Sequence, residues 1–236
     1  MSVVSRRRSA GALQVLAVVA LALVASFATP SLAQEGAQAA DTGAIGPAPA
    51  AVAPAVPAPV ADLVTVIIDT TLGPITVALD RGRAPITAGN FLRYVDGKRF
   101  DETSFYRAVR IDEAGEYGLV QGGLQGNPKK AFKPILHEAP HATGLSHVDG
   151  AISMARENPG TATADFFFVI GDLKALDGNV AENDPGYAVF GRVAAGMEVV
   201  KQILEQPRDA EKGADQGMKG QMLAQPVKIL SVRRQP

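Results

Sequence analysis

Hydrophobic and polar positions alternate from about residue 62 onward with the period of two that is typical of half-buried strands. The β-branched run VTVIID, residues 64–69, and the alternating run ITVALD, residues 75–80, flank a turn predicted around Gly73-Pro74, so together they predict a hairpin. Six further strands are predicted at SFYRAVR (104–110), GLVQGG (118–123), GAISMAR (150–156), DFFFVI (165–170), AVFGRV (188–193) and PVKILSV (226–232).

Two other segments show a helical pattern. Pro85 fits the first position of a helix that Gly97 ends, and a second helix is predicted over Met197–Gln206, before Pro207. One face of the first helix is expected to carry Ile86, Asn90, Phe91, Tyr94 and Val95, and the buried side of the second is expected to carry Val199, Val200, Ile203 and Leu204. About eight short strands with two widely separated helices predict a mostly β fold. We expect a closed eight-stranded antiparallel barrel capped by two helices, although periodicity alone does not give the strand order.

The first 61 residues have a different composition. Three arginines at positions 6–8 precede the apolar run Leu13–Ala28, and Ser31-Leu32-Ala33 offers the small residues that a signal peptidase reads. Residues 1–33 are therefore predicted to be a signal peptide and the location periplasmic, with an uncleaved membrane anchor as the alternative. The adjacent arginines leave export by the Sec or the twin-arginine route open. Residues 34–61 are rich in Ala and Pro and predict a disordered linker, followed by one folded domain over 62–236.

Charge and composition narrow the function classes. The net charge is −1 and the isoelectric point about 6.3, so the chain lacks the basic footprint of a nucleic-acid-binding protein. Cysteine is absent, which excludes disulfides, thiol catalysis and cysteine-based metal sites. We expect no cofactor, no stable membrane insertion after signal cleavage, and a monomer.

The stretch HEAPH, His137–His141, has the H-E-x-x-H pattern of zinc hydrolases. That pattern binds zinc on a helix, where imidazoles at positions i and i+4 share one metal. Pro140 lies inside the stretch and another proline precedes it, so a loop is predicted instead. His147 could supply a third ligand, but no spacing requires it. We therefore predict three partly exposed loop histidines and no metal site.

Seven short motifs occur in order between about residues 64 and 203: APITAGNF, SFYR, LVQGG, GAISMA, PGTATADFFF, ALDG and YAVFGRV. Their order and intervals resemble the cyclophilins, a family of peptidyl-prolyl cis-trans isomerases. The resemblance implies a cyclophilin-like barrel that accelerates X–Pro isomerisation and acts on unfolded or extended polypeptide segments. With the predicted signal peptide, the expected role is to assist the folding of exported proteins. The alternative is a low-activity proline-peptide binding module or holdase.

The resemblance also implies the site residues. Arg107 in SFYR corresponds to the catalytic arginine, and Gln121 orients Arg107 or the substrate carbonyl. The substrate-binding residues implied are Leu119, Ala155, Arg156, Phe167, Leu176 and Tyr187. Leu119, Phe167, Leu176 and Tyr187 form the proline pocket, and the backbone of Arg156 pairs with the peptide.

These residue types suit the reaction. Rotation about a peptide bond meets a barrier of about 18–20 kcal/mol, because the nitrogen lone pair is conjugated with the carbonyl. In the twisted state the proline nitrogen becomes basic, so an arginine N–H can donate to it there and not in the planar ground state. The apolar pocket grips the ring while the other side of the bond turns.

Several positions depart from the family pattern. The stretch between Arg107 and Gln121 is longer than usual, and Gly118 falls where a pocket phenylalanine is common, so either Tyr117 substitutes or the register shifts. Asp165 replaces a common glutamine, and a further insertion covers about 179–186. Ala175 replaces the tryptophan beside the proline pocket, so the resemblance implies weak binding of cyclosporin.

Overall fold

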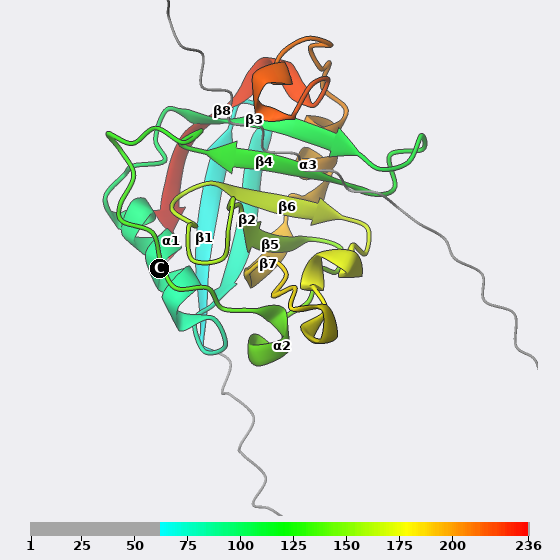
Figure 1. Cartoon of the computed structure of the whole chain (residues 1–236). Helices are drawn as coiled ribbons and strands as arrows, with labels where there is room; N and C mark the ends of the chain where they lie inside the picture. The colour runs from blue at the N-terminus through cyan, green and yellow to red at the C-terminus, as the bar shows by residue number, and fades with distance from the viewer. Residues whose placement is uncertain (1–61, 236) are drawn as a thin grey trace, which may run out of the picture. The chain divides into compact units, whose positions relative to one another are not determined.

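The computed structural model describes residues 62–235, so the predicted signal peptide and linker lie outside the described residues. The predicted fold is confirmed: eight strands form a closed antiparallel barrel in the order β1-β2-β7-β5-β6-β4-β3-β8 (Figure 1). The strands are β1 (Leu63–Thr70), β2 (Gly73–Asp80), β3 (Thr103–Arg110), β4 (Gly118–Gly123), β5 (Ala151–Met154), β6 (Phe166–Ile170), β7 (Val189–Ala195) and β8 (Met222–Arg234).

The first hairpin is confirmed, but its turn was misplaced by two residues. The turn is Thr71-Leu72, because Gly73 already pairs with Thr70 and Pro74 with Asp69. The Thr70 hydroxyl accepts a hydrogen bond from the backbone N–H of Leu72 and donates one to the carbonyl of Gly73. These two bonds close the turn before Gly73, so Gly73 and Pro74 belong to β2.

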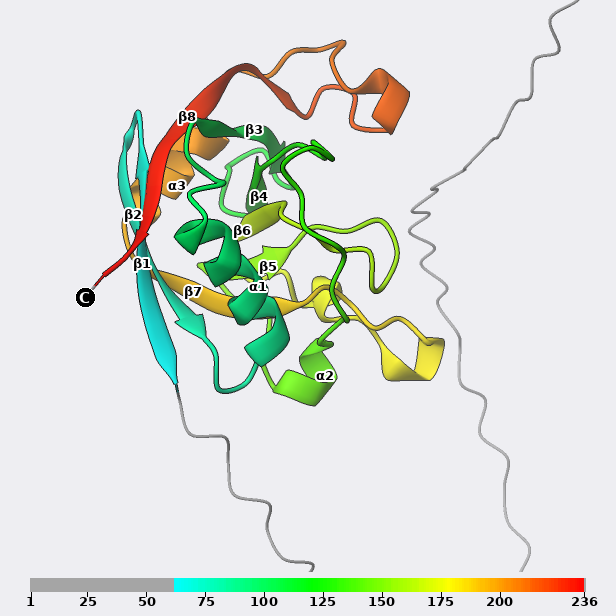
Figure 2. The same ribbon diagram turned by 90° about the vertical axis from the view of Figure 1, so that its left-hand side faces the viewer.

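Two longer helices cover opposite ends of the barrel, α1 (Pro85–Asp96) in front and α3 (Met197–Leu204) behind in Figure 2. Proline occupies the start of α1 as predicted, and the buried side predicted for α3 is confirmed, although α3 ends two residues early. Four residues of the face predicted for α1 are buried, but Ile86 is 41% exposed and the neighbouring Thr87 is buried. A one-turn helix, α2 (Pro140–Thr143), was not predicted.

The alternation of side chains along β6 separates the core from the groove described below. Phe166 and Phe168 point into the barrel and join the main core with Phe91 of α1. Phe167 and Val169 point outward and form a second, smaller apolar cluster with residues of β7 and of the loops nearby. The FFF run therefore supplies both the barrel interior and an apolar surface outside it.

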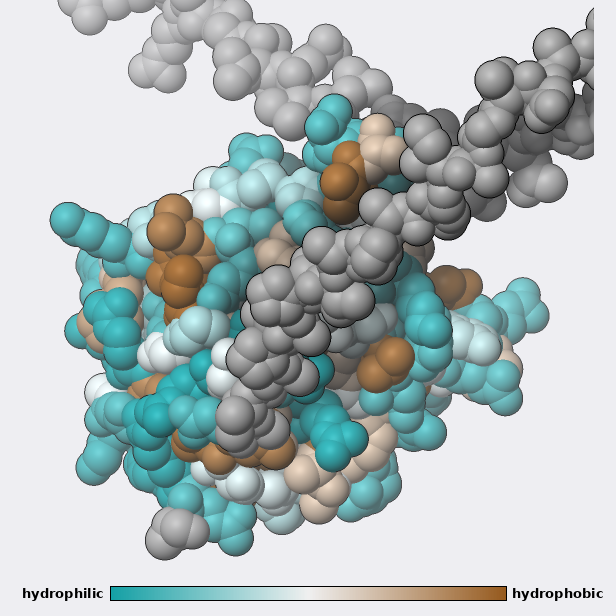
Figure 3. All heavy atoms as spheres, turned by 90° about the horizontal axis from the view of Figure 1, so that it is seen from below, coloured by the Kyte–Doolittle hydropathy of each residue, from teal (hydrophilic) through white to brown (hydrophobic). Residues whose placement is uncertain are grey.

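Seen from below, the surface is largely hydrophilic, and its hydrophobic residues form separate small groups (Figure 3). Within residues 62–235, no helix has the length and hydrophobicity needed to span a membrane.

Candidate active site

The eight site residues predicted from the sequence line one groove of about 980 Å³ on the outer face of the barrel. Strand β3 supplies Arg107, β4 supplies Leu119 and Gln121, and β6 supplies Phe167. The 3₁₀ turn Lys174–Asp177 supplies Leu176, and loops supply Ala155, Arg156 and Tyr187. The structure thus brings all eight together, and the role of each stays a prediction.

Arg107 is half-buried, and its guanidinium is held by two glutamines. Its Nη1 donates to the side-chain oxygen of Gln121 at 2.8 Å, while its Nε and Nη2 donate to the side-chain oxygen of Gln221 at 2.8 and 2.5 Å. Burial lowers the pKa of Arg107 from its ordinary value, because the surrounding protein removes water from the charged form. Both partners are neutral, so the guanidinium is oriented while no carboxylate of residues 62–235 pairs with its charge.

Gln121 is itself fixed by a buried polar chain. Its amide nitrogen donates to the hydroxyl of Tyr106 at 2.7 Å, which leaves its oxygen to face Arg107. Behind Tyr106 lies Asp165, which accepts backbone N–H bonds from residues 125 and 126. Burial raises the pKa of both Asp165 and Tyr106, and the nearby carboxylate raises that of Tyr106 further. Two roles were predicted for Gln121, which were to orient Arg107 or to orient the substrate carbonyl. Its contact with Arg107 favours the first.

The apolar part of the groove is built around Phe167. Leu119, Leu176 and Tyr187 pack in the same cluster, and the rings of Phe167 and Tyr187 meet edge to face with centroids 5.7 Å apart. The cluster lies in the same groove as Arg107, so one ligand can contact both the apolar cluster and the N–H donors of Arg107.

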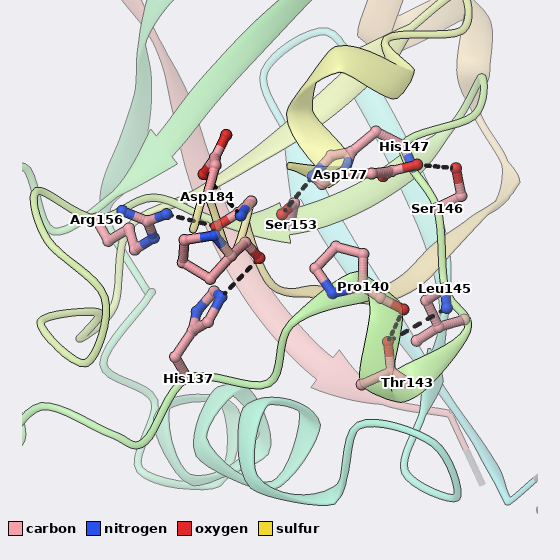
Figure 4. A network of polar contacts seen from close by, with 12 residues as sticks. His137, Pro140, Thr143, Leu145, Ser146, His147, Ser153, Arg156, Asp177 and Asp184 are labelled. Atoms are coloured by element: carbon pink, nitrogen blue, oxygen red, sulfur yellow. Dashed lines mark hydrogen bonds and ion pairs between the residues drawn. The ribbon is translucent and has the colours of Figure 1, made fainter. Parts of the chain in front are cut away.

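His147 lies behind this pocket, and its predicted partial exposure was wrong. It is 0% exposed, it stacks on Phe167, and its Nδ1 and Nε2 lie 2.6 Å from Asp177 and 3.0 Å from Ser153 (Figure 4). Asp177 also accepts hydrogen bonds from the backbone N–H of His147 and from Ser146. Tertiary packing that no local pattern signals explains the error.

Arg156 has a side-chain role that the sequence did not suggest. Its guanidinium carbon lies 4.6 Å from the ring centroid of Tyr187, and its Nη2 donates to the carbonyl of Gly186 (Figure 4). These contacts join the loop after β5 to the loop before β7. They stabilise the position of Tyr187 at the edge of the groove.

Three residues at which the sequence departs from the family pattern lie outside the groove. Gly118 does not line the groove: a Cβ there would meet the carbonyl of Val109 at 2.5 Å and the side chain of Leu204 at 3.1 Å. Tyr117 does not substitute for a pocket phenylalanine, because it is 43% exposed and packs over Gly171. Ala175 is exposed in a 3₁₀ turn, next to Leu176, and adds no surface to the groove.

The segment between α3 and β8 forms a wall of the groove that sequence reasoning missed. Asp215, Gln216 and Met218 line the groove, and Gln221 contacts Arg107. The one signal in the sequence was length, since residues 205–221 are far more than a connection of this kind needs.

The HEAPH stretch has a structural explanation. The carboxylate of Glu138 accepts hydrogen bonds from the backbone N–H of Ile86 and from the N–H and hydroxyl of Thr87, so it caps the first turn of α1. Nε2 of His137 lies 3.2 Å from the carbonyl of Pro185. Pro140 starts α2 instead of interrupting a helix, so His137 and His141 do not share a helical face. Among the described residues no group of three His, Asp or Glu side chains is placed to hold a metal ion.

Comparisons with known proteins point to one family. The family model for cyclophilin type peptidyl-prolyl cis-trans isomerase/CLD matches residues 64–234. The chain is 37% identical over 167 residues to a peptidyl-prolyl cis-trans isomerase of Acinetobacter baylyi, a match that covers 70% of this chain and 81% of the relative. It is 34% identical over 173 residues to one of Streptomyces antibioticus, covering 72% and 97%.

A similar fold is found in a crystal structure of a cyclophilin type peptidyl-prolyl cis-trans isomerase of Cryptosporidium parvum. The TM-score is 0.58 at 20% identity, over 74% of this chain and 98% of the other. A second crystal structure of that protein, in the presence of the dipeptide Ala-Pro, matches equally well, with a TM-score of 0.58 over 73% and 99%. At this identity the likeness supports the fold.

Proposed function

The chain belongs to the cyclophilin-type peptidyl-prolyl cis-trans isomerases, and we propose that it isomerises X–Pro bonds in the groove around Arg107, with exported polypeptides as substrates. The fold and the family agree on the activity, so the chain is an isomerase. The catalytic residues, the substrates and the location are our assignment.

The observation that carries the site is the placement of the Arg107 guanidinium in one groove with the apolar cluster at Phe167. Three of its five N–H donors bond to Gln121 and Gln221 among the described residues, which leaves two for a substrate. A proline ring seated on Phe167 would bring its nitrogen toward these donors. The N–H bond strengthens as the nitrogen loses conjugation, so the stabilisation is greatest in the twisted state.

No covalent bond breaks in this reaction, so the residues need only bind, orient and exclude water. Phe167, Leu119 and Leu176 offer the ring an apolar surface, and Tyr187, held by Arg156, borders it. The X residue and its carbonyl turn on the open side of the groove. Arg107 stays charged throughout, because a guanidinium is not deprotonated in proteins, and its neutral amide partners leave that charge available to the substrate.

A proline-isomerisation assay on a tetrapeptide containing Ala-Pro tests the proposal. We expect turnover by the intact protein and removal of most of it by Arg107→Ala, while Arg192→Ala, at an exposed arginine of β7, changes nothing. Equal turnover by both variants would refute the assignment of Arg107 without affecting the family.

A binding module without catalysis is less well supported. The departure that favoured it was Gly118 in place of a pocket phenylalanine, and Gly118 faces Leu204 of α3 instead of the groove. The proposed substrates are extended X–Pro segments, in keeping with the Ala-Pro dipeptide of the related crystal structure.

We further propose export to the periplasm, supported by the basic, apolar and small-residue sequence of positions 6–33. Mass spectrometry of the periplasmic fraction is expected to find a chain beginning at Gln34. A chain that retains Met1 in the membrane fraction would instead support the anchor. We expect the mature enzyme to be a monomer, and light scattering that gives twice the mass of one chain would contradict this.

A further inference from the structure

Gln221 makes two of the three described hydrogen bonds of the Arg107 guanidinium, and no motif of the sequence pointed to it. One oxygen of its amide accepts from both Nε and Nη2 of Arg107, at 2.8 and 2.5 Å. The residues are 114 positions apart in the chain. A single acceptor shared by these two N–H groups lies along one edge of the guanidinium, so it restricts rotation of the whole planar group.

The backbone of Gln221 is tied to the strand that carries Arg107. Its carbonyl accepts from the N–H of Ala108 at 2.9 Å, and its N–H donates to the carbonyl of Met218 at 3.0 Å. Met222, the next residue, is the β8 partner of Arg107. Gln221 lies directly before β8 and is therefore held in a set register against Arg107 on β3, so its side-chain amide is positioned beside the guanidinium.

A large bulge in β8 creates this register. Phe105 pairs with Val227 and Arg107 with Met222, so one β3 residue lies opposite the four β8 residues 223–226. The bulged residues pair instead with the segment after α3, through a bridge between Arg208 and Leu223 and a bond from the N–H of Ala224 to the carbonyl of Pro207. The bulge turns the chain outward at the groove and places Gln221 over Arg107.

We propose that Gln221 is a positioning residue of the isomerase, which aims the guanidinium of Arg107 at the proline nitrogen. This inference rests on the proposed role of Arg107. Gln121 accepts from Nη1 and Gln221 accepts from Nε and Nη2, so the guanidinium plane is fixed and each of the two remaining N–H donors has a set direction. A neutral amide does this while the positive charge stays available to the twisted state, whereas a carboxylate would neutralise it.

The test compares Gln221→Met, which keeps the size of the side chain and removes the acceptor, with Gln225→Met. Gln225 is exposed on the bulged part of β8, so its variant is a matched control. We expect Gln221→Met to lower kcat about tenfold, or ~1.4 kcal/mol in activation free energy, with KM within about twofold. Gln225→Met should match the wild type. Gln221→Ala replaces Gln221→Met if the Met variant does not fold.

A double-mutant cycle separates positioning from a structural role. In an Arg107→Ala background, Gln221→Met should have no further effect on kcat, because the group that it acts through is gone. The Arg107 Nε–H signal in NMR spectra should move in Gln221→Met and not in Gln225→Met. Unchanged kcat in Gln221→Met, or an equal loss in both backgrounds, would overturn the inference. If Arg107→Ala itself has no effect, the proposed site fails instead.

Discussion

The imidazole of His147 and the ring of Phe167 are stacked, with centroids 5.9 Å apart and planes 9° from parallel. A fully buried histidine thus forms the back of the apolar pocket. The same histidine is bonded to Asp177, which follows Leu176 of the pocket directly in the chain. Two walls of the pocket therefore depend on one polar contact inside the protein.

Stability should depend on pH through His147. Burial lowers the pKa of this imidazole below its ordinary value of 6.5, and its bond to Asp177 only partly offsets this. His147 therefore binds a proton more readily in the unfolded chain than in the folded one. The neutral imidazole contributes to the free energy of unfolding fully above pH 6.5, and this contribution is lost as the pH falls from 6.5 to the lower pKa of the folded state. Denaturant unfolding of the wild type and of His147→Asn at several pH values measures it.

We expect His147→Asn to be less stable by about 1–3 kcal/mol at pH 7. Below pH 6.5 its free energy of unfolding should fall less steeply than that of the wild type. His141→Asn, at an exposed histidine, is the control and should keep the full decline. Identical pH profiles for wild type and His147→Asn would show that the buried imidazole is not the titrating group.

Arg107→Ala should reduce kcat/KM about 10- to 100-fold, the range of about 1.5–3 kcal/mol for a hydrogen bond to a charged group. Arg107→Lys should recover little, because an ammonium cannot contact both glutamines and still present directed N–H donors. Protease-coupled kinetics with circular dichroism provide the measurement. Full activity of a folded Lys variant would mean that charge alone suffices.

Inhibition by cyclosporin should be weak and should improve with Ala175→Trp. Ala175 is exposed beside Leu176, and the chain contains no tryptophan. A central aromatic side chain commonly contributes about 2 kcal/mol or more to such a site, about thirtyfold in affinity. A cyclosporin titration of activity for the two proteins tests this, with Lys174→Trp as a neighbouring control. Tight inhibition of the wild type would contradict the argument.

Glu138→Ala should lower the free energy of unfolding by about 1–2 kcal/mol, because α1 loses the carboxylate that accepts from its first N–H groups. Treatment of the wild type with EDTA should change neither stability nor activity. The pair of measurements distinguishes a helix cap from a zinc ligand set. A loss of stability with EDTA would restore the metal hypothesis.

A chain that begins at Asp62 should unfold at the same temperature as the chain from Gln34, within about 2 °C. Residues 34–61 carry few side chains able to bury area, so they add little to the stability of the domain. Thermal unfolding of both by circular dichroism is sufficient. A midpoint many degrees lower in the shorter chain would show that the segment packs on the barrel.

The sequence was most informative where one local period determines which face is buried. The alternation in DFFFVI places Phe167 opposite to Phe166 and Phe168, and the helical period of Met197–Leu204 gave its buried side correctly. It was least informative where partners come from distant segments. The burial of His147 depends on Asp177 and Ser153, and the contact of Gln221 with Arg107 depends on a bulge over residues 223–226, of which the predicted strand included only Pro226.

The barrel is closed by pairing its first strand with its last, with Ile68 opposite Val232. A polypeptide leaves the ribosome or a translocation channel with its N-terminus first, so β1 has only one strand neighbour until β8 has emerged. Gln221, the partner of Arg107, emerges directly before β8. The barrel and the groove are therefore completed in the same late step of synthesis. A chain delivered only as far as β7 is an open sheet in which Arg107 lacks one of its two glutamine partners.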